Sequence, residues 1–377
     1  MGHIATIAEA IEEIRKGRMV ILVDDEDREN EGDLVIAAEK VTPQAINFMA
    51  THARGLICVS LPSEKIDALQ LAPMTRHNRA PLGTAFTVSV DAATDVGSGL
   101  SARDRAHAVQ VLMRDDCALS DLRTPGHTFP LRARKGGVLV RAGQTEGSVD
   151  LARLAGLKPG AVICEIMSPD GTMARLPELL EFGRQHGIRV VTVADLIRYR
   201  LQKESFVRVV ADVELPTDFG VFRAIAYENE LDTHVHLALV MGDIHPDEPA
   251  LVRVHRADLV ADVFGFTGDR SKNRLDASLR RIAEARLGVL LYLRTGANGE
   301  MALDTLQSYL DGKRAPADAA TVAPRGGKMD FREFGIGAQI LSHLGLRKIR
   351  VLTNHPQPFH GVSGFGLEIV SFEPIGA

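Results

Sequence analysis

The sequence predicts two layered domains, each an α/β or α+β arrangement of helices and strands. The chain has 377 residues, which is more than one hydrophobic core usually serves. Short apolar runs typical of buried strands are interspersed with segments whose apolar residues recur at helical spacing. Apolar residues make up 45% of the chain and charged residues 25%, values that favour a globular protein over a disordered or fibrous one.

Helix and strand patterns fill the first half of the chain. Ile4, Ile7, Ile11 and Ile14 fall at helical spacing and predict an amphipathic helix at the start. Compact apolar runs predict strands, and longer periodic stretches predict helices. The strands are expected at residues 19–23, 34–38, 55–61, 86–90 and 161–166, and further helices at 43–53, 103–113 and 192–202.

A polar junction follows the helix expected at 192–202. Lys203, Glu204 and Ser205 place the domain boundary there, so we expect domains at 1–203 and 204–377. A stretch rich in Pro, Ala, Gly and Lys at 312–328 predicts a mobile loop. The second domain is expected to hold strands at 206–211, 235–241, 251–254, 289–293 and 349–353, and helices at 275–285 and 334–344.

The composition excludes several classes of protein. A net charge of -5 and the absence of Trp argue against nucleic-acid binding. The three cysteines, Cys58, Cys117 and Cys164, form no CxxC pair, which argues against a disulfide framework or a zinc knuckle. The first residues lack an apolar signal core, and no apolar run is long enough to span a membrane. We therefore expect a cytoplasmic protein without a membrane partner.

The most distinctive segment is acidic. Between Asp24 and Asp33, seven carboxylates surround one cation, Arg28, and two apolar strands flank the segment. Such a run is often only a solvated turn. Carboxylates held at strand ends can instead converge on a cation, and oxygen ligands suit Mg²⁺ or Mn²⁺.

A second polar segment runs from Arg123 to Glu146. It contains His127 within an Arg-Thr-Pro-Gly-His sequence, a Gly136-Gly137 pair, and the run from Arg141 to Glu146. Glycines let a backbone approach a ligand, Arg and Thr donate to phosphate oxygens, and His moves protons near neutral pH. Each piece alone is weak, since a single His is more often a packed or surface residue.

Together these segments closely resemble the 3,4-dihydroxy-2-butanone 4-phosphate synthase family over roughly residues 4–200. The resemblance implies conversion of ribulose 5-phosphate to dihydroxybutanone phosphate and formate, with Mg²⁺ or Mn²⁺, by a homodimer formed through the front domain. The matching motifs are DDEDRENEGDL at 24–34, GSGLSARDR at 97–105, RTPGHTFPLRARKGGVLVR at 123–141 and CEIMSPDGTMAR at 164–175.

The resemblance also assigns roles to individual residues. His127, Glu165 and Asp33 match catalytic positions, and Glu29 matches a metal ligand. Where the family commonly has a histidine ligand, this chain has Gln144, whose amide oxygen can still bind Mg²⁺, so we expect altered or weaker metal binding. The expected substrate contacts are Arg28, Glu29, Asp33, Arg141, Ala142, Gly143, Gln144, Thr145 and Glu165.

Glu165 ends an apolar stretch, and this setting favours a carboxyl group with a raised pKa. Burial would disfavour its charged form and suit it to proton transfer. The alternative for this residue is a purely structural acid at the end of a strand.

Residues from about 206 resemble the GTP cyclohydrolase II family, through motifs such as Val252-Arg253-Val254-His255 and Gly335-Ile336-Gly337-Ala338-Gln339. That family binds catalytic zinc through three cysteines. The matching positions here are Asp258, Asp269 and Ser271, while Asp330 and Arg332 match its proton acceptor and nucleophile.

This second site is expected to be degenerate. Thiolates hold zinc tightly, so the substituted set predicts no bound zinc and no cyclohydrolase activity. The family's Glu-Gly-Arg nucleotide loop reads Gly296-Ala297-Asn298, and Gln357 and Pro358 stand where a lysine is expected. Two alternatives stay open: a bifunctional enzyme that keeps both activities, and a non-catalytic regulatory partner of riboflavin enzymes.

Overall fold

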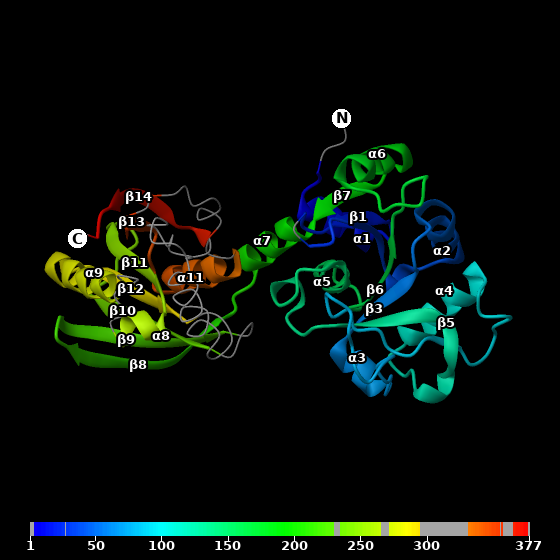
Figure 1. Cartoon of the computed structure of the whole chain (residues 1–377), viewed down its shortest axis with the longest axis horizontal. Helices are drawn as coiled ribbons and strands as arrows, with labels where there is room; N and C mark the ends of the chain where they lie inside the picture. The colour runs from blue at the N-terminus through cyan, green and yellow to red at the C-terminus, as the bar shows by residue number, and fades with distance from the viewer. Residues whose placement is uncertain are drawn as a thin grey trace, which may run out of the picture. The chain divides into compact units, whose positions relative to one another are not determined.

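The computed structural model describes residues 4–26, 28–229, 234–264, 271–294, 331–354, 356 and 365–375. The chain divides into two compact units, Met1–Tyr199 and Arg200–Ala377, each built on its own sheet (Figure 1). The division falls just before the polar junction expected at Lys203. No described helix is both long and apolar enough to cross a membrane.

The first unit contains a seven-stranded mixed sheet in the order β4-β5-β3-β6-β2-β1-β7. Every residue of β1 and β2 is buried, as the apolar runs at 20–23 and 34–37 predict, and the buried part of β2 includes Asp33. The strands are β1 (Val20–Val23), β2 (Gly32–Ala37), β3 (Cys58–Pro62), β4 (Val90–Ala92), β5 (Leu122–Ala133), β6 (Ala161–Glu165) and β7 (Arg189–Thr192).

Helices cover both faces of this sheet (Figure 1). One large apolar core includes side chains from α2, α4 and α6, whereas α5 packs across β2 and β6 from the other face. The helices are α1 (Ile7–Arg15), α2 (Pro43–Phe48), α3 (Ser63–Ala68), α4 (Ala102–Leu112), α5 (Gln144–Leu154), α6 (Leu176–His186) and α7 (Val193–Lys203).

Local signals explain the helix predicted at the start of the chain. Thr6 accepts a hydrogen bond from the Glu9 backbone and the Glu9 side chain returns one, a capping box that starts α1. Its buried face carries Ile7, Ile11 and Ile14, as predicted. The helix expected at 43–53 is α2 followed by a π-helical turn at Met49–Ala53.

One strand expected in the first unit was wrong, and another strand was not predicted. Residues 86–90 form isolated bridges rather than a strand, and β4 begins only at Val90. The twelve residues of β5 form the longest strand of this sheet, although they contain Pro125 and Pro130. Proline cannot donate to a sheet ladder, so the sequence around His127 does not suggest a strand.

The second unit is also a seven-stranded sheet, in the order β14-β13-β11-β12-β10-β9-β8. Apolar residues of α11 pack on one face and those of α9 on the other. The elements are β8 (Val207–Thr217), β9 (Gly220–Asn229), β10 (Val235–Met241), β11 (Ala250–Arg256), α8 (Leu259–Asp262), α9 (Ser271–Ala285), β12 (Gly288–Leu293), α11 (Phe331–His343), β13 (Lys348–Leu352) and β14 (Glu368–Glu373).

The expected strands and helices of this unit are present, with shifted ends. Strand β8 is longer than predicted, and β9 was not predicted. The loop expected at 312–328 lies outside the described residues.

The last turn of α7 belongs to the second unit. The Gln339 side chain, on α11, donates to the carbonyl oxygens of Leu201 and Glu204, each at 2.7 Å, and accepts from the Phe206 N–H at 2.9 Å. Arg200, also buried, pairs with Glu204 at 2.8 Å. Carbonyl groups at a helix end need such partners when they are buried. One buried amide therefore caps α7.

Candidate functional site

The expected front-site residues, apart from His127, gather where β1 ends, β2 begins and β6 ends. Strands β1 and β2 are antiparallel neighbours, so the acidic segment is the connection between them. Strand β6 pairs with β2 on its other side, which places Glu165 directly opposite Asp33. The N-terminus of α5 reaches the same place, because the Gln144 side chain bonds to the acidic segment.

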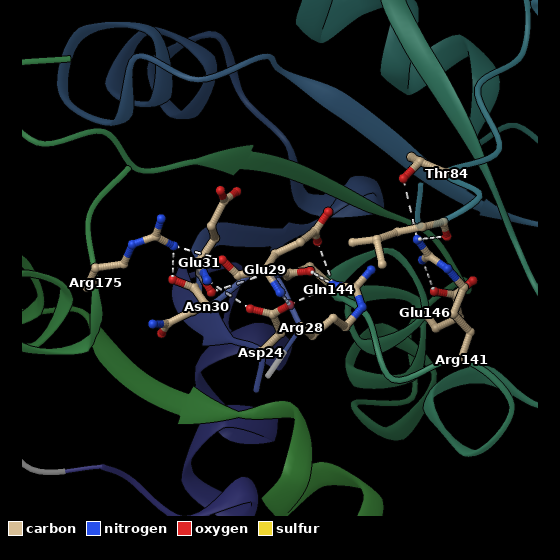
Figure 2. Close-up of polar contacts among 11 residues, drawn as sticks. Asp24, Arg28, Glu29, Asn30, Glu31, Thr84, Arg141, Gln144, Glu146 and Arg175 are labelled. Atoms are coloured by element: carbon tan, nitrogen blue, oxygen red, sulfur yellow. Dashed lines mark hydrogen bonds and ion pairs between the residues drawn. The ribbon is translucent and has the colours of Figure 1, made fainter. Parts of the chain in front are cut away.

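Arg28 is the centre of the acidic segment (Figure 2). Its Nη1 atom lies 2.6 Å from Asp24 Oδ2, 2.5 Å from Glu29 Oε2 and 3.0 Å from Gln144 Oε1. Among the described residues, no three His, Cys, Asp or Glu side chains form a group that could hold a metal ion, and the expected convergence of the carboxylates on a metal stays a prediction. Oxygen atoms converge on a guanidinium.

Hydrogen bonds from two side chains to its backbone fix the rest of the acidic segment. The Asp24 carboxylate accepts from the Glu29 N–H at 3.1 Å and from the Glu31 N–H at 2.8 Å. Arg175 donates to the carbonyl oxygens of Glu29 and Asn30 from the other side. These bonds are inconsistent with a merely solvated turn, because the Asp24 side chain is completely buried. They hold the Glu29 backbone in place.

Asp33 and Glu165 form a cross-strand pair of carboxyl groups. Opposite residues of adjacent strands lie close together, so two negative charges there repel. Burial and the nearby Glu165 and Glu29 raise the pKa of Asp33 well above its usual value. Burial likewise raises the pKa of Glu165, although the Leu56 N–H donates to its Oε2 at 2.8 Å and opposes the rise. Two neighbouring carboxyl groups with raised pKa values suit proton transfer.

A neutral side chain at position 33 should stabilise the fold at higher pH. A carboxyl group whose pKa is raised by folding adds its full stability below the unfolded-state pKa, about 4, and loses that stability as pH rises through the folded-state pKa. Asp33→Asn should therefore melt roughly 2–4 °C above the unaltered protein at about pH 8, equivalent to about 1 kcal/mol. The difference should shrink towards pH 4. Thermal unfolding across this range measures it, and a constant difference would contradict the assignment.

Two guanidinium groups face the start of α5. A Cβ atom at Gly143 would lie 2.8 Å from Arg141 Nη1 and 3.0 Å from Arg28 Nη2, so both groups flank this glycine. Gly143 offers no side-chain cap to α5, which leaves the first N–H groups of the helix for a ligand. Arg141 is held by Glu146, with 2.7 Å between Nη1 and Oε2. A helix N-terminus with two guanidinium groups favours a phosphate.

The other two expected loop residues are Ala142, next to this glycine, and Thr145, in the first turn of α5. Ala142 is partly buried, and Thr145 is buried, with its carbonyl accepting from Ser148 at 2.9 Å.

His127 lies on β5 and contacts none of the other expected catalytic residues. Its ring Nδ1 lies 2.9 Å from the Asp91 Oδ2 atom, and its backbone N–H donates to Asp91 Oδ1 at 2.9 Å. Strand β3 separates β5 from β6, so the backbones of His127 and Glu165 are about 10 Å apart. The ring is partly exposed, with 44% of the side chain accessible.

The oxygen atoms near Arg28 fit a hard divalent cation. The Glu29 carboxylate and the Gln144 amide oxygen already meet at one positively charged atom, at 2.5 and 3.0 Å. Oxygen donors of these two types suit Mg²⁺ and Mn²⁺. A metal at this point would have to share or replace the partners of Arg28.

The second expected site is only partly described. Asp258 precedes α8, and its carboxylate accepts from the backbones of Val260 and Ala261, each at 3.0 Å. It therefore caps a helix where the zinc family has a cysteine ligand. Ser271 and Arg332 lie in the first turns of α9 and α11, and only their backbones are described. Asp269, Asp330, Gly296, Ala297, Asn298, Gln357 and Pro358 lie outside the described residues.

Beside Asp258, three further side chains form a buried polar group. Asp262 accepts from the Tyr292 hydroxyl at 2.9 Å and lies 3.0 Å from His255 Nε2. The Asp258 N–H donates to the same Asp262 carboxylate at 2.9 Å. Hydrogen bonds to His255, Tyr292 and the backbone keep the pKa of Asp262 low in spite of burial. The group joins α8 to β11 and β12.

Sequence comparisons agree with this division of the chain. A sequence model of 3,4-dihydroxy-2-butanone 4-phosphate synthase matches residues 8–199, and one of GTP cyclohydrolase II matches residues 207–374. Riboflavin biosynthesis protein RibBA of Aquifex aeolicus is 50% identical over 98% of this chain and 92% of its own length. RibBA of Bacillus subtilis is 47% identical over 98% of this chain and 93% of its own.

Solved structures match this chain either over nearly its whole length or over about half of it. RibBX of A. baumannii, described as a two-domain 3,4-dihydroxy-2-butanone 4-phosphate synthase, matches with a TM-score of 0.78 and 37% identity, over 98% of this chain and 99% of that one. A 3,4-dihydroxy-2-butanone 4-phosphate synthase with two magnesium ions matches with a TM-score of 0.50 and 44% identity, over 52% of this chain and 96% of that one. The chain therefore belongs to the family of riboflavin biosynthesis proteins that join a 3,4-dihydroxy-2-butanone 4-phosphate synthase domain to a GTP cyclohydrolase II-like domain.

Proposed function

We propose that the first unit converts ribulose 5-phosphate to 3,4-dihydroxy-2-butanone 4-phosphate and formate, as the synthase family does. The observation that carries this function is the Asp33–Glu165 pair, whose raised pKa values suit proton transfer. The acidic segment links this pair to the two guanidinium groups at Gly143, a place for a phosphate. A sugar phosphate needs both features.

The reaction assigns separate tasks to these residues. The substrate must lose a proton beside its carbonyl, lose its C1 hydroxyl, rearrange its carbon skeleton and release C4 as formate. Asp33, Glu165 and His127 are the groups that move protons. Arg28 and Arg141 hold the phosphate. A divalent cation held by Glu29 and Gln144 would supply charge stabilisation for the enediolate oxygens.

Formate release tests this function directly. The purified full chain, given ribulose 5-phosphate and Mg²⁺, is expected to release formate and the phosphorylated product in equal amounts. Mn²⁺ in place of Mg²⁺ identifies the better metal, and a chelator should stop the reaction. If neither cation supports formate release, the synthase function is wrong and the regulatory alternative remains.

Gln144 should determine which metal the site prefers. An imidazole favours Zn²⁺ and Ni²⁺ more than an amide oxygen does. Gln144→His is therefore expected to raise the affinity for Ni²⁺ relative to Mg²⁺ by on the order of tenfold. Calorimetric titration of the substrate-free protein measures both affinities, with Gln185→His on the exposed face of α6 as the control. An unchanged affinity ratio would remove Gln144 from the metal site.

The second unit is proposed to lack GTP cyclohydrolase II activity. This proposal is supported by the use of the Asp258 carboxylate as a helix cap, and by the description of the A. baumannii protein as a two-domain synthase. Without three thiolates the zinc that the cyclohydrolase family uses has no tight site. Incubation with GTP and Zn²⁺ should give no pyrimidine product. Product formation would establish a bifunctional enzyme.

We also propose that the protein acts in the cytoplasm as a homodimer through its first unit, as the family resemblance implies. The His127 ring bonds to Asp91 through Nδ1, and its partly exposed outer edge is where a second copy can meet it. Light scattering of the purified chain should give twice the chain mass.

A further inference from the structure

We propose that Asp91 is the positioning residue of His127, fixing which ring nitrogen carries the proton. This inference rests on the proposed role of His127 in proton transfer. The two oxygens of the Asp91 carboxylate have separate tasks: Oδ1 accepts the His127 backbone N–H and Oδ2 faces the ring Nδ1, each at 2.9 Å. A carboxylate can only accept, so Nδ1 carries the hydrogen. The lone pair of Nε2 is then free to take a proton.

The surroundings of this pair are built for close approach. A Cβ atom at Gly99 would lie 2.1 Å from Asp91 Oδ2 and 2.6 Å from the ring Nδ1 of His127. A Cβ atom at Gly126 would lie 2.1 Å from the Val90 carbonyl carbon. Glycine at both positions lets the Gly99 loop and strand β5 close on β4. Any side chain there would separate carboxylate and ring.

The Gly99 loop is itself anchored to α4. The Asp104 carboxylate accepts from the Gly99 N–H at 3.1 Å, and the Asp104 N–H donates to the Ser101 hydroxyl at 3.1 Å, which caps the helix. Asp104 is buried, with 6% of its surface exposed. The Gly99 loop is therefore held in place on one side of the Asp91–His127 pair. Asp91 itself is 8% exposed, whereas the outer edge of the ring reaches solvent.

Asp91→Asn reverses the proton position. The backbone N–H of His127 always donates, so the amide oxygen of Asn takes that bond and its NH₂ group faces Nδ1. Nδ1 must then be unprotonated, and the hydrogen moves to Nε2. A wrong tautomer in an Asp–His pair lowers kcat by up to about 10⁴-fold in the serine protease case. Here we expect a fall in kcat of about 10²-fold or more, with KM for ribulose 5-phosphate changed by less than about threefold.

The experiment combines formate kinetics with ¹⁵N NMR of histidine-labelled full chain, which reports the tautomer of His127 without turnover. Asp91→Asn should show the Nε2–H tautomer and the fall in kcat, and it should cause no further loss when added to His127→Asn. Asp91→Glu should keep the Nδ1–H tautomer and recover part of the rate. Asp116→Asn is the control, because its carboxylate pairs with Arg114 on the surface.

The outcomes separate this inference from the function on which it rests. If His127→Asn keeps the full rate, the catalytic role of His127 is wrong. If His127→Asn is inactive but Asp91→Asn keeps both rate and tautomer, the positioning role of Asp91 is wrong. Additive losses in the double variant would also overturn it. Should Asp91→Asn not fold, Gly99→Ala keeps both side chains, and an unchanged kcat and tautomer in that variant would reject the proposal.

Discussion

Glu165→Gln should lower kcat for formate release by about 10²–10⁴-fold, the usual effect of removing a positioned acid or base. The glutamine amide oxygen can still accept the Leu56 N–H that now donates to Glu165 at 2.8 Å, so the local fold is kept. The ionisable carboxyl group, whose pKa burial raises, is lost. Steady-state kinetics of formate release measure the change.

A matched control separates this effect from the loss of a carboxylate as such. The Glu39 carboxylate also accepts a backbone N–H, that of Lys158 at 2.9 Å, but Glu39 lies on the exposed surface. Glu39→Gln should therefore leave kcat within about twofold, as surface substitutions usually do. If Glu165→Gln retains more than about a third of the native kcat, Glu165 is a structural acid at a strand end and proton transfer must be assigned elsewhere.

Arg141→Met should destabilise the protein by about 3–5 kcal/mol, because it strands a buried charge. The Glu146 side chain is 1% exposed, and Arg141 is its ion-pair partner at 2.7 Å. The same change removes one of the two guanidinium groups at Gly143, so KM for ribulose 5-phosphate should rise by about tenfold or more. Thermal unfolding and formate kinetics measure the two effects separately.

A second substitution separates stability from binding. In the Arg141→Met/Glu146→Gln double variant neither position carries a charge, and the glutamine oxygen can still accept the Arg134 N–H, now at 3.0 Å from Glu146. Most of the lost stability should return while KM stays raised. Recovery of the native KM together with stability would show that Arg141 only supports the fold and does not contact the phosphate.

The sequence identifies the front site well where chemistry and pattern coincide. Apolar runs place β1, β2 and β6, and the acidic segment between two of them needs no tertiary information. The raised pKa of Glu165 also follows from its apolar neighbours. The hydrogen bond between Arg28 and Gln144 could not be predicted from the sequence, because 116 positions separate the two residues and only the tertiary fold brings them together.

Other functional side chains were missed for a similar reason. Asp24, Asp91, Glu146 and Arg175 each act by holding another residue, and nothing in their local sequence distinguishes them from surface charges. The sequence carries one signal for Asp91. Gly99 and Gly126 are glycines because a side chain at either position would clash with Asp91 or with the backbone of Val90. In the second unit, helix propensity around Asp258 is too short-range to reveal that its side chain caps α8.

The hydrogen bonds of the Gln339 side chain to Leu201, Glu204 and Phe206 determine where the chain can be cut into separate fragments. A fragment begun at residue 204, where the sequence suggests a boundary, would lack Arg200 and Leu201. It would leave Gln339 without the Leu201 carbonyl and Glu204 without its guanidinium partner. A fragment begun ahead of Arg200 keeps every partner of that amide. The stretch that reads as a linker is thus part of the architecture of the second unit, and insertions or tags placed there would disturb it.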